Sequence, residues 1–157
     1  MEHKGAQEGA IVTNRKAFRD FEILDTMECG IVLQGTEVKS LREHRVNLGD
    51  SFARIVKGEM FLFNMHINPY GFGNLNNHEP LRTRKLLLHK KEIKKLIGQV
   101  TLKGTSLIPL KLYFKNGRVK VQLAIGKGKT AIDKRESLKK KAADMEVRKA
   151  VRLRAKS

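Results

Sequence analysis

The clearest structural signal in this chain is the segment Pro109-Leu-Lys-Leu-Tyr-Phe-Lys-Asn-Gly-Arg-Val-Lys-Val-Gln-Leu-Ala-Ile125. Its dipeptide Asn116-Gly117 is typical of a type I′ turn between two antiparallel strands. On both sides of the turn, apolar residues alternate with basic or polar ones, which predicts one core face and one cationic face. The predicted core face holds Leu110, Leu112, Phe114, Val119, Val121, Leu123 and Ile125.

Upstream of this hairpin, further strands and short helices are predicted. Residues 21–33 are strand-like, and residues 51–56 and 59–67 flank Lys57-Gly58, a second hairpin signal. A helix is expected over residues 37–44, with Thr36 as its N-cap. A second helix is predicted from the spacing of four apolar residues and a glycine that would end it: Leu86, Ile93, Leu96, Ile97 and Gly98.

The number and order of these elements favour a mainly β protein. Five or six strands with helices between them, and no regular β-α-β alternation, predict a small closed barrel of the oligonucleotide-binding type with about three helices. The predicted parts are a flexible N-terminus (1–13), the barrel with helical insertions (14–131) and a basic C-terminal tail (132–157). The Gly- and Asn-rich residues 70–78 are expected to form a mobile loop.

The charge of the chain points to a polyanionic partner. The net charge is +17 (33 minus 16), and residues 126–157 alone carry +8 (12 Lys/Arg minus 4 Asp/Glu). This tail has almost no large apolar side chains, so it is expected to be disordered when free. Nucleic acid releases counterions when Lys and Arg neutralise its phosphates, which makes RNA the preferred partner.

Other features argue against a membrane or an extracellular location. Cys29 is the only cysteine, and the N-terminus lacks the apolar segment of a signal peptide. No apolar run approaches the roughly 18 to 20 residues of a membrane span. The sequence therefore predicts a soluble cytoplasmic protein with no membrane partner.

No catalytic site is evident. Residues 126–130 resemble a phosphate-binding loop, but such a loop needs a glycine where Leu123 stands. The five histidines have no metal-ligand spacing. Glu28, Glu37 and Asp50 show no nucleophile–base pairing and are expected to pair with neighbouring cations. We therefore expect no catalytic residue, cofactor, metal or small-molecule substrate.

Several basic segments are predicted to form an RNA-binding surface together with the cationic face of the hairpin: Arg82, Arg84, Lys85, Lys127 and Lys129. Tyr70, Phe72 and Tyr113 are the aromatic residues nearest to them and are candidates for stacking on bases. Because aromatic residues make up only 6% of the chain, recognition of a folded RNA by its shape and phosphates is favoured.

Six motifs, in order, resemble one family. They are Asn14-Arg-Lys-Ala, Glu28-Cys-Gly-Ile, Gly35-Thr-Glu-Val-Lys-Ser-Leu-Arg, Arg82-Thr-Arg-Lys-Leu-Leu-Leu-His-Lys-Lys-Glu-Ile, Pro109-Leu-Lys-Leu-Tyr-Phe-Lys-Asn, and Gly126-Lys-Gly-Lys with Asp133-Lys-Arg. Together they are similar to the small protein B family, the bacterial tmRNA-binding (SsrA-binding) proteins. The similarity runs from about residue 14 to 135 and is followed by a tail of matching length and charge.

The resemblance implies an oligonucleotide-binding barrel with three helices and an adaptor function. The adaptor would bind the tRNA-like domain of tmRNA and deliver it to stalled ribosomes for trans-translation, which rescues the ribosome and tags the nascent chain. It would act as a monomer in the complex and perform no covalent chemistry. A structural ribosomal or translation-factor-like protein with the same barrel is the alternative, and an RNA-processing enzyme is a third possibility.

The resemblance also implies roles for individual residues. Asn14, Glu28, Leu87 and Lys120 match positions that bind tmRNA. Residues 126–129 match the loop that leads to the tail, and the tail would contact small-subunit RNA near the decoding centre and in the empty mRNA channel. The residues expected there are Ile132, Asp133, Lys134, Arg135, Lys139, Lys140, Arg148, Lys149, Arg152 and Arg154. Ile132 stands where the family often has His or Tyr, and Cys29 replaces a small residue and is expected only to pack.

Overall fold

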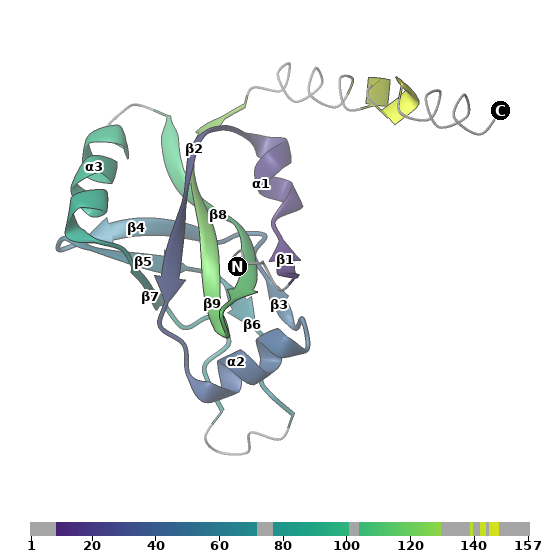
Figure 1. Ribbon diagram of the computed structural model, residues 1–157, viewed down its shortest axis with the longest axis vertical. Coiled ribbons are helices and arrows are strands. Elements are labelled where there is room, and N and C mark those ends of the chain that lie inside the picture. The colour runs from purple at the N-terminus through teal and green to yellow at the C-terminus, as the bar shows by residue number, and fades with distance from the viewer. Residues whose placement is uncertain are drawn as a thin grey trace.

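The computed structural model describes residues 9–71, 77–100 and 104–129, and residues 139, 142, 143 and 145–147 of the tail. The fold is mainly β (Figure 1). The strands are β1 (Ala10–Thr13), β2 (Phe21–Ile31), β3 (Val46–Asn47), β4 (Phe52–Val56), β5 (Glu59–Phe63), β6 (His66–Ile67), β7 (Arg84–Leu87), β8 (Thr105–Lys115) and β9 (Arg118–Gly128). The helices within residues 9–129 are α1 (Arg15–Asp20), α2 (Gly35–Arg42) and α3 (Lys90–Val100).

The main sheet closes on itself. Its strand order is β1-β8-β4-β5-β7-β2-β9, and β9 also pairs with β8. Strands β8, β4, β5, β7, β2 and β9 therefore form a continuous ring of antiparallel pairs, which we call the strand ring. The β4–β8 pairing rests on Ala53 and Leu107 only, so this is the weakest join of the ring. Strands β3 and β6 form a separate two-stranded sheet.

Both hairpin turns predicted from the sequence are confirmed. Lys57 and Gly58 have φ of 52° and 77°, and Asn116 and Gly117 have φ of 53° and 76°. Positive φ at both central residues is what a type I′ turn requires, and its twist matches that of the flanking strands. The turns therefore fix the register of β4 with β5 and of β8 with β9.

Two apolar clusters stabilise this arrangement. The larger one fills the strand ring with side chains from its strands and from the adjoining helices, among them Leu41, Met60, Leu62, Leu96 and Leu123. The smaller cluster lies under α1 and consists of Ala17, Ile108, Leu110 and Ala124.

A β-bulge in β8 divides the hairpin between these clusters. Pro109 pairs with Leu123 and Lys111 with Gln122, so Leu110 lacks a direct partner on β9. The extra residue reverses the alternation of faces, and Leu110 joins the cluster under α1, not that of Leu112. Leu110 is therefore buried, as predicted, but the core does not follow one uninterrupted face of the hairpin.

Other element boundaries also differ from the predictions. Strand β1 begins at Ala10, within the segment 1–13 that is predicted to be flexible, and it pairs with β8. Leu86 lies in β7 and not in a helix, and α3 continues past Gly98 to Val100. The N-cap of α2 is Gln34 and not Thr36.

The predicted loop at residues 70–78 is tied down at both ends. The Asn77 side chain donates to and accepts from the backbone of Tyr70, and the buried His78 ring contacts the Thr36 hydroxyl and the carbonyl oxygen of Ile67. Residues 72–76 lie outside the described part. None of the helices described is long and apolar enough to cross a membrane.

Candidate nucleic-acid interface

A gap separates an apolar side chain from a cation on the surface of three neighbouring strands. On β2, Gly30 pairs with Leu87 of β7 on one side and with Lys120 of β9 on the other. Leu87 is half-exposed, and Gly30 has no side chain to fill the space beside it. A Cβ atom added at Gly30 would lie only 3.2 Å from the Cβ of Leu87. We call this row of three residues the Gly30 notch.

The Gly30 notch opens into a groove near the tip of the β8–β9 hairpin. The groove has a volume of about 290 Å³, and its lining includes Ile31, Val38 and Arg118. Its walls are thus apolar on the β7 side and cationic on the β9 side. A base or ribose packed against Leu87 would place a phosphate within reach of Lys120 or Arg118, which suits RNA better than an uncharged ligand.

Glu28 lies two residues before Gly30 on the same strand and is held by two residues of β8. The Tyr113 hydroxyl donates to its carboxylate at 2.5 Å, and Lys115 Nζ donates at 3.2 Å. The hydrogen bond from Tyr113 is the main cause that lowers the pKa of Glu28, so this carboxylate is ionised at neutral pH. In the described structure no carboxylate lies within ion-pair distance of Lys120, whereas the charge of Lys115 is offset by Glu28.

Three of the four residues that the resemblance assigns to tmRNA binding thus meet at this surface, and the fourth does not. Asn14 is buried, and its side chain is fully used inside the protein. Its Oδ1 accepts from the backbone N–H of Ala17, while its Nδ2 donates to the carbonyl oxygens of Pro109 and Leu48. The structure makes Asn14 the N-cap of α1 and its anchor on β8.

Arg84 was predicted as an RNA contact, and this prediction is wrong. Its side chain is completely buried. Nε donates to Glu37 at 2.6 Å, and Nη1 donates to the carbonyl oxygen of Met65 at 2.6 Å. Strand alternation was the available signal, because Arg84 shares the inward face of β7 with Leu86.

Arg82 and Lys85 are more exposed than Arg84 but already have acidic partners. Arg82 Nη2 donates to Glu37 at 2.7 Å, and less than a third of its side chain is exposed. Lys85 lies on the outer face of β7 and pairs with Glu59. Of the two, Lys85 is the better placed to contact RNA.

Lys127 and Lys129 lie at the opposite end of β9 from the Gly30 notch. Lys120 and Lys127 are seven positions apart (127 minus 120), or about 23 Å along an extended strand. The backbone N–H of Lys129 donates to the carbonyl oxygen of Asp20, and its Nζ donates to that of Phe18. The predicted basic surface is therefore divided between the two ends of β9.

Of the aromatic residues predicted to stack on bases, Tyr113 is excluded because only 3% of it is exposed. Tyr70 lies under the Lys39 ammonium group, and Phe72 is outside the described residues. Sequence reasoning missed Gly30 and the support of Glu28 by Tyr113. The Glu28-Cys-Gly-Ile motif contains Gly30, but the sequence does not show which residues lie beside Gly30 on the neighbouring strands.

Cys29 is buried in the core, as expected, and burial is the main cause that raises the pKa of its thiol to about 12. Within the described part, no cluster of His, Cys, Asp or Glu is placed to hold a metal ion. Most of the predicted ribosome contacts lie outside the described residues. These are Ile132, Asp133, Lys134, Arg135, Lys140, Arg148, Lys149, Arg152 and Arg154, whereas Lys139 is described and exposed.

The chain is similar to known proteins over most of its length. A family model described as SmpB protein matches residues 11–153. An SsrA-binding protein of Geobacter sulfurreducens is 57% identical over 150 residues, which cover 96% of this chain and 98% of the relative. An SsrA-binding protein of Bacillus subtilis is 62% identical over 139 residues, which cover 88% and 89%.

A solved structure has the same fold. It is described as "tmRNA-SmpB: a journey to the center of the bacterial ribosome", and one of its chains superimposes with a TM-score of 0.67 at 49% identity. The superposition covers 81% of this chain and 93% of that one.

Proposed function

The chain belongs to the SmpB protein family, and we propose that it is an RNA-binding adaptor that binds the tRNA-like domain of tmRNA and delivers it to stalled ribosomes for trans-translation. Its partners are therefore tmRNA and the ribosome, chiefly the RNA of the small subunit. The names of its relatives and of the solved structure support both partners. The adaptor binds and positions RNA and is not an enzyme, and its place of action is the cytoplasm, where translation occurs.

The Gly30 notch is the observation that supports this function most directly. The apolar Leu87 packs against a base or ribose, and Lys120 neutralises a phosphate. The absence of a side chain at Gly30 lets the nucleotide approach the backbone of β2 closely. Glu28 accepts hydrogen bonds from base or sugar donors, and Tyr113 and Lys115 hold it in place.

The remaining basic residues belong to two parts of the chain, the strand ring and the tail, which have different roles. Lys127 and Lys129 lie where β9 ends and the chain continues toward the tail (Figure 1). We assign residues 132–157 to the ribosome, where their charge suits a channel walled by phosphates. Residues 132–135 then contact the small subunit at the decoding centre, and the rest of the segment contacts the mRNA channel.

The strand ring fits a barrel of the oligonucleotide-binding type. Its closure through β8–β9 leaves no free edge between these two strands, and its outer surface carries the proposed RNA contacts. We place the RNA-binding domain at residues 10–131, which includes β1 because this strand pairs with β8. One copy of the chain suffices for each tmRNA.

A competition assay at near-physiological salt tests the proposed function. Labelled tRNA-like domain of tmRNA is bound to the full chain and challenged with excess bulk tRNA. The complex should persist, and Lys120→Ala should weaken it by about 1 to 3 kcal/mol, as expected for a charge-assisted contact. Lys94→Ala on α3 removes the same charge outside the lining of the groove at the Gly30 notch and is the matched control. Equal losses in both variants would contradict a specific site.

Truncation after Arg135 tests the division of labour. Affinity for tmRNA should remain within about twofold of the full chain, since the contacts of the Gly30 notch persist. Tagging of nascent chains on stalled ribosomes should be abolished. A parallel loss of tmRNA affinity and tagging would contradict the separation of the two parts.

A further inference from the structure

Three phenylalanine side chains on neighbouring strands lie outside the core. Phe52 of β4 and Phe61 and Phe63 of β5 are half-buried, and none of them belongs to either apolar cluster. Met60 and Leu62 alternate with them on β5 and are fully buried, so the three rings lie on the outside of the strand ring. We call this surface the outer aromatic face.

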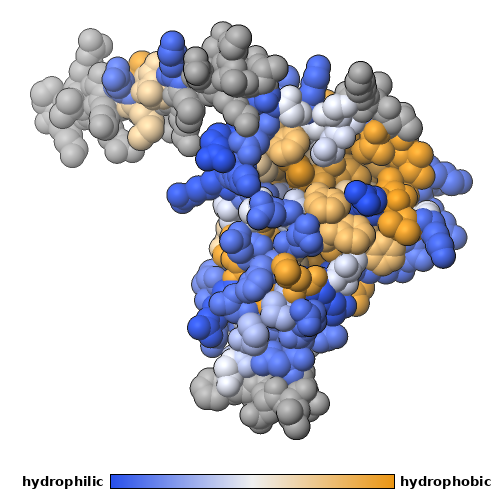
Figure 2. All heavy atoms as spheres, turned by 180° about the vertical axis from the view of Figure 1, so that it is seen from behind, coloured by the Kyte–Doolittle hydropathy of each residue, from blue (hydrophilic) through white to orange (hydrophobic). Residues whose placement is uncertain are grey.

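The rings of this face are ordered by strand pairing. Phe52 and Phe63 are direct cross-strand partners, and their rings stack with centroids 5.3 Å apart and an interplanar angle of 15°. Figure 2 shows the molecule from behind. Hydrophobic side chains cluster over the β4–β5 side, with hydrophilic side chains among them. The Arg54 guanidinium also lies over both of these rings, 5.4 Å from the centroid of Phe52 and 5.9 Å from that of Phe63. Among the described residues, Phe61 is thus the ring of this face that can stack on a nucleobase, because every base has a π-face.

Two cations border the outer aromatic face. Phe61 pairs with Arg54 of β4 on one side and with Lys85 of β7 on the other. The Arg54 guanidinium lies 5.4 Å from the ring centroid of Phe52. No carboxylate of the described residues is within ion-pair distance of Arg54, whereas Lys85 pairs with Glu59. The row Arg54–Phe61–Lys85 thus places a stacking ring between two groups able to bind phosphate.

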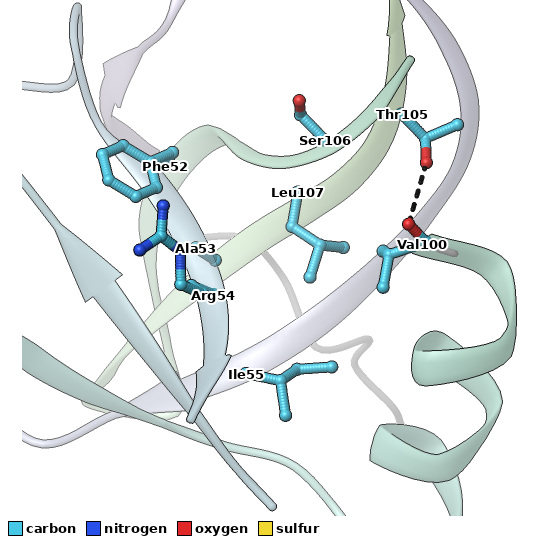
Figure 3. Close-up of a pocket in the computed structure, with 8 residues that line it drawn as sticks. All are labelled: Phe52, Ala53, Arg54, Ile55, Val100, Thr105, Ser106 and Leu107. Atoms are coloured by element: carbon cyan, nitrogen blue, oxygen red, sulfur yellow. Dashed lines mark hydrogen bonds between the residues drawn. The ribbon is translucent and has the colours of Figure 1, made fainter. Parts of the chain in front are cut away.

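A groove of about 400 Å³ adjoins this face at the weak join between β4 and β8. Figure 3 shows the Phe52 ring and the Arg54 guanidinium together at one side of the groove and Thr105 and Ser106 at another. The Thr105 hydroxyl donates to the carbonyl oxygen of Val100 at the end of α3. Aromatic, cationic and hydroxyl groups therefore meet around one opening, which is a lining suited to nucleotides.

We propose that the outer aromatic face binds unpaired nucleotides of tmRNA and thereby extends the interface of the Gly30 notch. The two surfaces are continuous through β7, because Lys85 and Leu87 both point outward and lie two residues, about 6.6 Å, apart. An RNA strand that leaves the notch at Leu87 therefore reaches Lys85 and then Phe61. The inference rests on the proposed function, since it assigns both surfaces to the same RNA.

The charge of this face favours RNA over an apolar protein partner. A protein that covered the three rings would also remove water from Arg54, which has no acidic partner within the described residues. Burying an unpaired charge is strongly unfavourable, whereas a phosphate supplies the missing anion. The net charge of +17 raises the local concentration of RNA and not of basic proteins.

Tryptophan fluorescence tests the stacking directly. The chain contains no tryptophan, so Phe61→Trp introduces one indole into the outer aromatic face, and Ile97→Trp on the exposed side of α3 is the control. Addition of full-length tmRNA to the full chain should quench the first variant and leave the second unchanged. Saturating tmRNA without a change in the Phe61→Trp signal would overturn the proposal.

Affinity measurements separate stacking from simple packing. Phe61→Leu keeps an apolar side chain but removes the ring, and it should weaken tmRNA binding at least about fivefold, the lower end of the range for loss of one stacked base. Phe61→Tyr should restore the affinity, and Ile97→Leu should leave it unchanged. Thermal unfolding of each variant shows that the fold is retained.

The same assays keep the two proposals distinguishable. If Lys120→Ala weakens tmRNA binding and Phe61→Leu does not, the Gly30 notch stands and the outer aromatic face is not part of the interface. If Phe61→Leu instead lowers binding to ribosomes free of tmRNA, the face belongs to a ribosomal partner, which also overturns the proposal. If neither variant affects tmRNA binding, the proposed function itself fails.

Discussion

Asn14 Nδ2 donates a 2.9 Å hydrogen bond to the carbonyl oxygen of Pro109, 95 positions away along the chain and immediately before the bulge of β8. The backbone N–H of Asn14 donates to the next carbonyl oxygen, that of Leu110, at 2.7 Å. One residue thus caps α1 and satisfies two carbonyl groups where the strand ladder is interrupted. Asn14 links the helix, the bulge and the small apolar cluster under α1.

Replacement of Asn14 should therefore act through stability and not through RNA contact. Asn14→Ala removes the helix cap and two buried side-chain hydrogen bonds, which should cost about 1 to 3 kcal/mol of unfolding free energy. Urea unfolding measures this loss. At temperatures where the variant remains folded, its affinity for tmRNA should match that of the unmodified chain. A large loss of affinity in fully folded Asn14→Ala would instead show a direct role.

The neighbouring residues Arg84 and Lys85 should respond oppositely to substitution. Arg84→Ala leaves the carboxylate of Glu37 buried without one of its two guanidinium partners and should cost about 3 to 5 kcal/mol. Lys85→Ala removes an exposed ion pair with Glu59 and should change stability by no more than about 1 kcal/mol. Urea unfolding of both variants makes the comparison, and similar losses would contradict the inward and outward placement of the two side chains.

The stability of the chain should fall at low pH because of Glu37. Burial opposes ionisation of this carboxyl group, but hydrogen bonds from Arg82, Gln34 and Arg84 together hold its pKa below the ordinary value of 4.5. A folded-state pKa below that of the unfolded chain gives stability that is fully present above about pH 4.5. It is lost as the pH falls through the folded-state pKa.

Glu37→Gln tests this pH dependence. The variant should be less stable at pH 7, and its unfolding free energy should change less between pH 5 and pH 3 than that of the unmodified chain, as expected from linkage. Urea unfolding across this interval provides the measurement. An unaltered pH dependence in the variant would assign the acid sensitivity to other carboxylates.

Tyr113 should support the ionisation of Glu28. The hydrogen bond from the Tyr113 hydroxyl is the largest single cause that lowers the pKa of Glu28. Tyr113→Phe removes this hydrogen bond and should therefore raise the pKa of Glu28. Carboxyl carbon NMR titration of the variant and of the unmodified chain measures the change, and an unchanged pKa in Tyr113→Phe would contradict the assignment.

We expect that even a methyl group at position 30 lowers the affinity for RNA. Gly30→Ala adds a Cβ 3.2 Å from that of Leu87 and fills the Gly30 notch, and we expect tmRNA affinity to fall about tenfold or more, a loss of about 1.4 kcal/mol. Gly98→Ala, in α3, has nothing within 4 Å of its added Cβ and serves as the control. If Gly30→Ala binds tmRNA normally, the close approach of a nucleotide to β2 is wrong.

Features that depend on residues close together in the chain can be predicted from the sequence alone. Asn116-Gly117 and Lys57-Gly58 set their hairpins because their backbones reach positive φ, and the flanking alternation supplied the register. The excess of basic residues and the six collinear motifs pointed to RNA and to the family. The expectation of an RNA partner needed no coordinates, because it follows from charge and composition.

Long-range strand pairing determines which polar side chains point into the core and which point outward. Arg84 and Lys85 are adjacent in a basic motif, yet one side chain is buried against Glu37 and the other is exposed, because β7 lies between β5 and β2 in the strand ring. Leu87, Gly30 and Lys120 come from three distant segments and meet only through strand register. The bulge at Leu110 has the same origin, since it depends on how β8 pairs with β9 and on the α1 helix packed over it. Such long-range pairing leaves no local pattern in the sequence.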